Sequence, residues 1–164
     1  MIFTIGYSNR TLPEFLGELR KRRVGQLWDV RSSPWSRNAP FNAPQIEQWA
    51  GRAGVMYRQE GSILGGHSRI PVDDPSYIAA LDRLINAAMR EPLAIMCAEG
   101  EPAHCHRSWD IGASLLVRHG IVVRNILRNG REEDITDTLS RTYPARIALT
   151  LRDALAGQRG PFEG

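Results

Sequence analysis

Short apolar segments alternate with helical patterns along the chain, and this alternation constrains the fold more than any other feature of the sequence. The apolar segments lie at residues 2–5, 26–30, 55–58, 93–96 and 121–127. The segments between them place apolar residues at the i, i+3, i+4, i+7 spacing of a buried helix face. The sequence therefore predicts a single three-layer, Rossmann-like α/β domain, with a mainly parallel sheet of about five strands and helices on both faces.

Helix start signals support this interpretation. Thr11 and Glu14 are spaced as a capping box, and Asp74 precedes a proline as helix N-caps often do. A further helix is expected to begin between His104 and Ser108. These local signals do not specify the order of the strands.

The length of 164 residues suits one domain, which we expect to span residues 1–156. One or two C-terminal helices, broken by Pro144, should lead to a flexible tail over residues 157–164. Hydrophobic residues make up 42% and charged residues 24%, which excludes collagenous, disulfide-scaffold and wholly disordered proteins.

Cysteine content and hydropathy indicate the cellular setting. The chain has only two cysteines, Cys97 and Cys105, so it does not fit a secreted disulfide framework. The N-terminus lacks the pattern of a signal peptide, and no run approaches the ~18 apolar residues of a membrane span. We therefore expect a cytoplasmic protein with no membrane association. The net charge of +3 permits an anionic partner without requiring one.

Chemically active residues follow the predicted strands at their carboxyl ends, where parallel sheets bind ligands. They are Tyr7, Ser8 and Asn9 after the first strand; Asp29, Arg31 and Arg37 after the second; Gly65, Gly66 and His67 after the third; and Cys97, Glu99, His104, Cys105, His106 and Arg107 after the fourth. This clustering at one edge predicts the functional site.

The most informative segment joins the fourth strand to a helix N-terminus. Cys105 at that position, beside His106, should have a lowered thiol pKa and could act as a nucleophile, with His106 as base or acid. Arg107 and the free helix N–H groups would bind an anion. The alternatives are that Cys97 is a small core residue and that Cys105 also packs inward.

The loop after the second strand carries a second group of candidates. Asp29 could transfer a proton or orient an arginine, while Arg31 and Arg37, with Ser8 and Asn9, would hold an anion. The alternative is an internal ion pair that holds the loops together. Trp35 and Phe41 are expected to be exposed aromatic residues, and the segment containing Gly65, Gly66 and His67 is long enough to form a lid. Tyr7, Glu99 and Cys97 are secondary candidates.

The cysteine segment can also be compared with a zinc site and with the active site of cysteine phosphatases. Cys97, His104, Cys105 and His106 supply four potential zinc ligands, although their spacing is not that of a C-x₂-C motif. Cysteine phosphatases place an arginine six positions after the nucleophile, whereas Arg107 follows Cys97 by ten. No cofactor is predicted, and zinc remains the alternative.

An ordered set of motifs resembles a known family. The motifs are residues 4–9, residues 29–31 followed by Ser36-Arg37, residues 64–66, and residues 97–99 followed by residues 105–107. In this order they resemble the domain-of-unknown-function family 488. The resemblance implies a compact prokaryotic α/β domain without an established biochemical role, and it supports the fold and the choice of site. Members of that family usually have histidine where this chain has Tyr7.

Together these features predict an enzyme acting on a phosphate-bearing substrate, either a nucleotide or a nucleic acid. Cys105, His106 and Asp29 would be catalytic. One alternative is a non-catalytic module that binds nucleic acid or another anion, and a further alternative is a Cys/His zinc site. The sequence does not indicate an oligomeric state.

Overall fold

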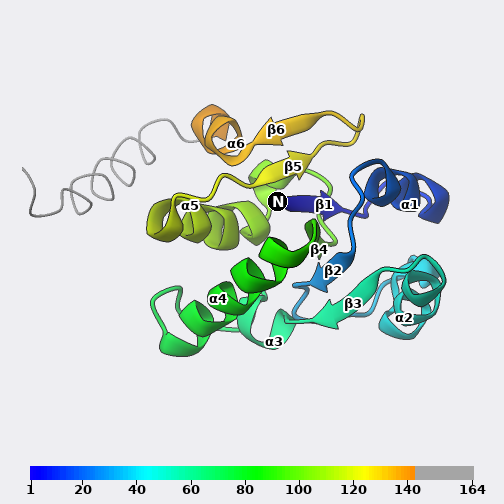
Figure 1. Ribbon diagram of the computed structural model, residues 1–164, viewed down its shortest axis with the longest axis horizontal. Helices are drawn as coiled ribbons and strands as arrows, with labels where there is room; N and C mark the ends of the chain where they lie inside the picture. Colours follow the sequence, from blue (N-terminus) through cyan, green and yellow to red (C-terminus); the bar gives the residue numbers. More distant parts are fainter. Residues whose placement is uncertain (143–164) are drawn as a thin grey trace, which may run out of the picture.

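A six-stranded sheet forms the middle layer of the domain in the computed structural model, which describes residues 1–142 (Figure 1). Its strands are β1 (Ile2–Gly6), β2 (Gln26–Asp29), β3 (Met56–Gln59), β4 (Leu93–Cys97), β5 (Arg124–Ile126) and β6 (Glu132–Asp134). The order across the sheet is β3-β2-β4-β1-β5-β6, and only β6 runs antiparallel to its neighbour. The predicted α/β class with a mainly parallel sheet is confirmed.

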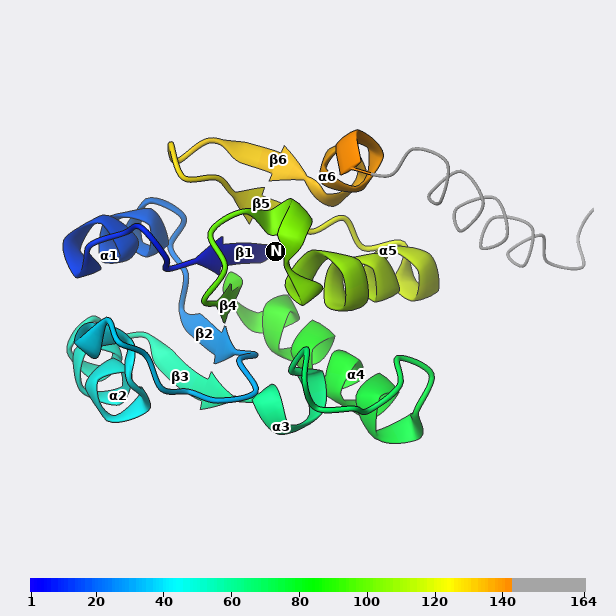
Figure 2. The same ribbon diagram turned by 180° about the vertical axis from the view of Figure 1, so that it is seen from behind.

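Helices cover both faces of this sheet. Figures 1 and 2 show α1 (Leu12–Lys21) and α2 (Ala43–Arg52) on one side, with α4 (Pro75–Arg90) and α5 (Ala113–His119) on the other. The remaining elements are α3 (Gly61–Leu64), α6 (Ile135–Thr142), the short 3₁₀ turns η1 (Ala39–Phe41) and η2 (Pro102–His104), and the π-helical turn η3 (Arg107–Gly112). Each helical layer buries its own apolar core against the sheet.

The predicted capping signals are formed. The Thr11 hydroxyl accepts the Glu14 N–H at 3.4 Å, and the Glu14 carboxylate accepts the Thr11 N–H at 2.7 Å. Asp74 caps α4 by accepting the Ser76 N–H at 2.8 Å. Both helices therefore begin where the sequence predicts.

The chain leaves β1 and β4 in opposite directions, which is the point in such sheets where ligands usually bind. β1 leads through α1 to β2, whereas β4 leads through α5 to β5 on the other side of β1. The two ends stay paired, since the Tyr7 and Ser8 N–H groups donate to Cys97 O at 3.2 Å and Ala98 O at 3.0 Å. Gly6 is required here, because a Cβ at this residue would lie 1.9 Å from Glu99 O.

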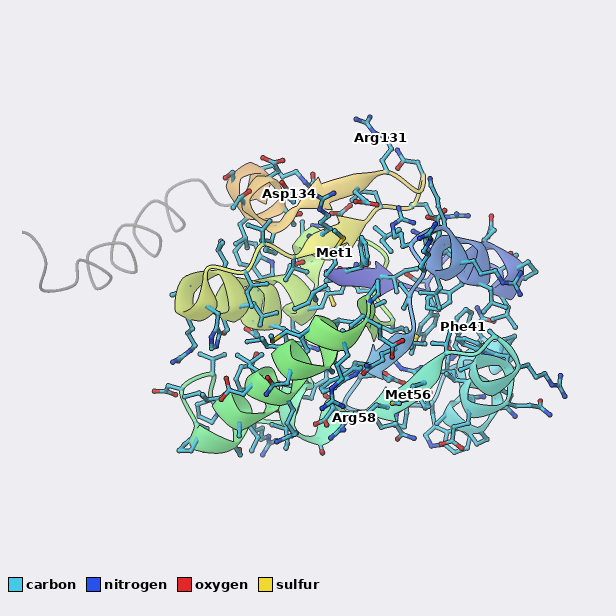
Figure 3. All side chains as sticks on the ribbon, viewed as in Figure 1. Met1, Phe41, Met56, Arg58, Arg131 and Asp134 are labelled. Atoms are coloured by element: carbon cyan, nitrogen blue, oxygen red, sulfur yellow. The ribbon has the colours of Figure 1, made fainter. Side chains whose placement is uncertain are left out.

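Three sequence predictions differ from the structure. The fifth strand is shorter than residues 121–127, and β6 was not predicted because Glu132-Glu133-Asp134 carries no apolar pattern. Phe41 is fully buried rather than exposed, since η1 turns its ring into the core between α1 and α2 (Figure 3). Trp35 is exposed, as expected.

The C-terminal predictions fall outside the described residues. These are the helices around Pro144, the domain boundary at residue 156 and the tail over residues 157–164. Within residues 1–142, none of the helices is both long and apolar enough to serve as a membrane span.

Candidate functional site

Two cysteines and a histidine meet at the carboxyl end of β4. Cys97 is the last residue of that strand, and Cys105 and His106 follow η2. The His106 Nδ1 atom lies 3.7 Å from Cys105 Sγ and 3.9 Å from Cys97 Sγ. Both cysteines are buried and His106 is half-buried. We call Cys97, Cys105 and His106 the sulfur cluster.

The orientation of His106 is set by a backbone carbonyl. Its Nε2 atom lies 3.1 Å from Val30 O, at the residue that follows β2. A carbonyl oxygen only accepts hydrogen bonds, so Nε2 carries a proton and Nδ1 is the atom that faces the sulfurs. Nδ1 can therefore accept a proton from a thiol or, once protonated, donate to a thiolate.

Cys105 lies between η2 and the start of the following helical segment, whose N-cap is His106. The Cys105 backbone is extended, with φ −123° and ψ 140°, and its carbonyl accepts the Ser108 N–H at 2.9 Å. The Arg107 backbone N–H is among the groups that lower the pKa of Cys105. This confirms the predicted position at a helix N-terminus, where N–H groups favour negative charge.

The surroundings of Cys105 favour its thiolate. A hydrogen bond from Cys97 lowers the pKa of Cys105, and His106 and the Arg107 charge lower it further against the effect of burial. The same hydrogen bond, together with burial, raises the pKa of Cys97. Cys97 therefore keeps its proton more readily than Cys105 does. Burial opposes charge on His106, but the Cys105 thiolate outweighs it and raises the pKa of His106. Both shifts favour a thiolate on Cys105 and a proton on His106.

Arg107 adds a buried positive charge near Cys105. Its side chain is 0% exposed and donates from Nε to Thr4 Oγ1 at 3.1 Å. Its other nitrogens donate to the carbonyl oxygens of Glu99 and Gly100, which lie in the loop between the two cysteines. Within residues 1–142, no carboxylate forms an ion pair with Arg107. Arg107 thus gives the cluster an uncompensated positive charge while its donors hold the loop.

Asp29 and Arg31 form a separate buried ion pair. Arg31 donates from Nε and one terminal nitrogen to the two Asp29 carboxylate oxygens at 2.8 and 2.5 Å. The second terminal nitrogen of Arg31 donates to Phe41 O at 2.8 Å. The Tyr57 hydroxyl completes the pair by donating to Asp29 at 2.6 Å. This is the internal ion pair that the sequence left as an alternative, and it holds the loop after β2.

Tyr7 belongs to this ion pair rather than to the sulfur cluster. Its ring stacks on Phe41 at a centroid distance of 4.5 Å, and its hydroxyl lies 3.4 Å from the Arg31 guanidinium. Sequence reasoning missed Tyr57, which β3 brings beside β2 in register with Leu27. No local motif marks a tyrosine in an edge strand as a partner of Asp29.

The segment after β3 covers the sulfur cluster. A Cβ added to Gly66 would lie 3.0 Å from His106 ring atoms, so the Gly66 backbone packs directly on the imidazole. Gly65 is packed against Ser32, whose hydroxyl accepts the His67 N–H at 2.9 Å. The side chains of His67 and Arg37 are exposed. The predicted lid segment therefore lies over His106.

The remaining candidates line a different space. A cavity of about 600 Å³ lies beside the ends of β1 and β5, and Ser8, Asn9 and Glu99 are part of its wall. None of the three sulfur cluster residues lines it. Asn9 adopts φ 62°, which is uncommon for a residue other than glycine. Ser8 and Asn9 are thus placed near the carboxyl edge but apart from Cys105.

Asp110 is a neighbour of the sulfur cluster that sequence reasoning missed. It lies one helical turn after His106 and is half-buried, and burial raises its pKa while the His106 charge lowers it. The signal was present in the sequence, because residues at i and i+4 share a helix face.

The sulfur cluster could also hold a metal ion. The two sulfurs and a His106 ring nitrogen lie within 4.8 Å of one another, and thiolate and imidazole ligands suit zinc. A hydrogen bond from the other ring nitrogen to a backbone carbonyl is typical of metal-binding histidines. His104 is exposed and outside this group, so the predicted set of four ligands is reduced to three.

Comparison with protein families gives one match, over residues 71–109. The chain resembles the family described as domain of unknown function DUF488. The resemblance inferred from the motifs is confirmed over this segment, which runs from the start of α4 through the whole sulfur cluster. No curated protein matches the chain. The matched segment contains the sulfur cluster, and the chemistry of this cluster is argued from its geometry.

Proposed function

We propose that the protein is an enzyme in which the Cys105 thiolate attacks a phosphate-bearing substrate and His106 transfers protons. One observation carries the proposal. Val30 O holds the His106 Nε2–H, so Nδ1 faces the Cys105 sulfur at 3.7 Å. A nucleophile paired with a base that a third group orients is the usual arrangement of covalent catalysis.

The proposed reaction has two steps that balance in protons. The Cys105 sulfur forms a bond to the electrophilic atom of the phosphate-bearing substrate. The bond between that atom and the leaving oxygen breaks. That oxygen takes the proton from His106 Nδ1. Neutral His106 then accepts a proton from water, whose oxygen displaces the Cys105 sulfur. The thiolate and the imidazolium are both regenerated.

The charge around Cys105 supports an anionic substrate. Arg107 is a buried cation next to the thiolate, and the helix N-terminus adds a partial positive charge. The guanidinium groups of Arg31 and Arg107 already donate to protein acceptors. A phosphate would therefore be held by backbone N–H groups and by exposed cations such as Arg37, with Arg107 acting at a distance.

The test is the rate of cysteine alkylation by iodoacetamide between pH 5 and 9, followed for each cysteine by peptide mass spectrometry. We expect Cys105 in the wild-type protein to react at pH 6 about tenfold or more faster than a free thiol. Inorganic phosphate should slow this reaction. Cys97→Ser should keep Cys105 reactive. Fast alkylation of Cys97 at pH 6 in Cys105→Ser would indicate that the nucleophile was assigned to the wrong residue.

Two outcomes would overturn the proposal. If Cys105 reacts only after treatment with a chelator, and purified protein contains one equivalent of zinc, the sulfur cluster is a zinc centre with three protein ligands. If both cysteines stay inert until the protein unfolds, they are core residues. The non-catalytic alternative would then be tested by binding to single-stranded and double-stranded DNA at increasing salt concentration.

A further inference from the structure

The proposed reaction uses only one of the two sulfurs and leaves Cys97 without a chemical role. The Cys97 and Cys105 sulfurs lie within 4.8 Å of each other. Both are buried, both contact the same His106 nitrogen, and neither forms a disulfide. The second sulfur is therefore close to the first.

We propose that Cys97 is a resolving thiol and that the two cysteines form a reversible disulfide when Cys105 reacts with a hydroperoxide. This second, redox activity relies on the thiolate of the proposed function but needs no phosphate-bearing substrate. A hydroperoxide suits the site because Cys97 is 8% and Cys105 3% exposed, which admits a small oxidant more readily than a protein disulfide.

The backbone allows the bond to form with a local movement. A disulfide requires sulfurs at about 2.05 Å, so these sulfurs must approach by less than about 3 Å. Cys97 is fixed in β4, whereas Cys105 has extended backbone between η2 and η3. Residues 98–104 join the two cysteines, and Arg107 holds this loop at Glu99 and Gly100. We therefore expect Cys105 to move and Cys97 to stay.

The chemistry balances with the groups present and one hydroperoxide. The Cys105 thiolate attacks the terminal oxygen, the O–O bond breaks, and the alkoxide leaving group takes the His106 proton to give an alcohol. This leaves a sulfenic acid on Cys105. The Cys97 thiol passes its proton to His106 and its sulfur attacks the Cys105 sulfur. The released hydroxide takes that proton as water, so two thiols are oxidised and one peroxide is reduced.

The oxidised form would lack the nucleophile. A disulfide consumes the Cys105 thiolate, so alkylation and any substrate turnover stop until a thiol reductant restores both cysteines. Without Cys97, the sulfenic acid would persist and oxidise further to sulfinic acid, which thiols do not reduce. Cys97 would thus direct the Cys105 sulfenic acid to a disulfide, which thiols reduce, and away from sulfinic acid.

The experiment treats the reduced full-length protein with one to five equivalents of hydrogen peroxide and measures its intact mass after denaturation. We expect wild-type protein to lose about 2 Da, in a monomer, and to recover its mass and Cys105 alkylation with dithiothreitol. Cys97→Ser should instead gain oxygen at Cys105 and form a dimedone adduct. Cys105→Ser should do neither at this dose. Peptide mapping separates these products from oxidation of the exposed Met56 and Met89 (Met56 in Figure 3).

The results distinguish this inference from the proposed function. If wild-type Cys105 gains oxygen without the 2 Da loss, or only intermolecular dimers form, Cys97 is not a resolving thiol even when Cys105 alkylation at pH 6 is fast. If the intramolecular disulfide forms and no phosphate-bearing compound protects Cys105 or is turned over, the redox activity stands and the phosphate substrate is wrong.

Discussion

Two side-chain pairs, Asp29–Arg31 and Cys105–His106, lie at the carboxyl ends of the neighbouring strands β2 and β4, and they differ in how completely their hydrogen bonds are satisfied. In the Asp29–Arg31 pair, both carboxylate oxygens accept hydrogen bonds from Arg31. The Tyr57 hydroxyl also donates to Asp29, and the Phe41 carbonyl oxygen accepts from Arg31. In the Cys105–His106 pair, the sulfur is a weak acceptor at 3.7 Å. The first pair uses strong bonds to support a loop, whereas the second keeps bonding capacity for another molecule.

The two pairs also differ in the residues that cover them. Phe41, fully buried, lies over Arg31 through its carbonyl and over Tyr7 through its ring. The cover of His106 is the exposed Gly66, which contributes backbone and no side chain. A buried ion pair beneath a packed aromatic ring is suited to a structural role, while a thiolate beneath a loop with adjacent glycines is suited to reaction. Four predictions test this distinction.

Asp29→Ala should have the largest effect. It leaves the Arg31 charge buried without its partner, since both side chains are almost fully buried. Breaking such a pair from one side costs about 3–5 kcal/mol of unfolding free energy. Urea denaturation measures this cost, with the exposed Asp73→Ala as the matched control. A loss of about 1 kcal/mol or less would show that the two pairs do not differ as described.

His106→Gln should raise the pKa of Cys105 while the protein stays folded. An opposite charge beside an ionisable group shifts its pKa by about 1–3 units, so the midpoint of the Cys105 alkylation profile should move up by about 1–3 pH units. His119→Gln, at the exposed end of α5, is the control and should change nothing. Equal alkylation in both variants would mean that His106 does not stabilise the thiolate.

The pH dependence of stability should carry the signature of the thiolate–imidazolium pair. The pKa of Cys105 is lowered in the folded state, so its contribution is present above the unfolded thiol pKa and is lost as pH falls toward the folded value. The raised pKa of His106 gives the opposite dependence, with its contribution lost as pH rises through the folded value. Between the unfolded histidine pKa of about 6.5 and the raised pKa of folded His106, the two slopes oppose each other.

The measurement is the unfolding free energy of wild type minus that of Cys105→Ser, obtained by urea denaturation between pH 4.5 and 9.5. We expect this difference to rise from pH 4.5 to about 6.5 and then to level off. Above about pH 9 it should fall, because the raised pKa of Cys97 means that the folded protein keeps a proton that the unfolded chain releases. A difference that is flat across the whole range would contradict the charged pair.

Tyr7→Phe should have the smallest effect. It removes only the 3.4 Å contact with Arg31 and keeps the stacked ring, so the expected loss is about 1 kcal/mol or less. Alkylation of Cys105 should be unchanged. A shifted alkylation profile would show that the two pairs are coupled, and would give Tyr7, which replaces the usual histidine of the resembling family, a role at the sulfur cluster.

The sequence by itself determined the fold class and the edge of the sheet that carries the chemistry. It also placed Cys105 at a helix N-terminus. These inferences depend on signals that span a few residues: apolar periodicity, the Thr11 capping box, and the rule that parallel strands end at one edge. Such signals act locally, so they survive without knowledge of the partners across the sheet.

Only the tertiary structure decided how those residues are partnered. The strand order puts β4 between β2 and β1, which brings Val30 O to His106 and Cys97 to Tyr7 N–H. It also turns Arg107 toward Thr4, although this arginine was expected to bind an anion. Hydrogen-bond partners far apart in the chain depend on which strands are neighbours, and no local pattern in the sequence encodes that order.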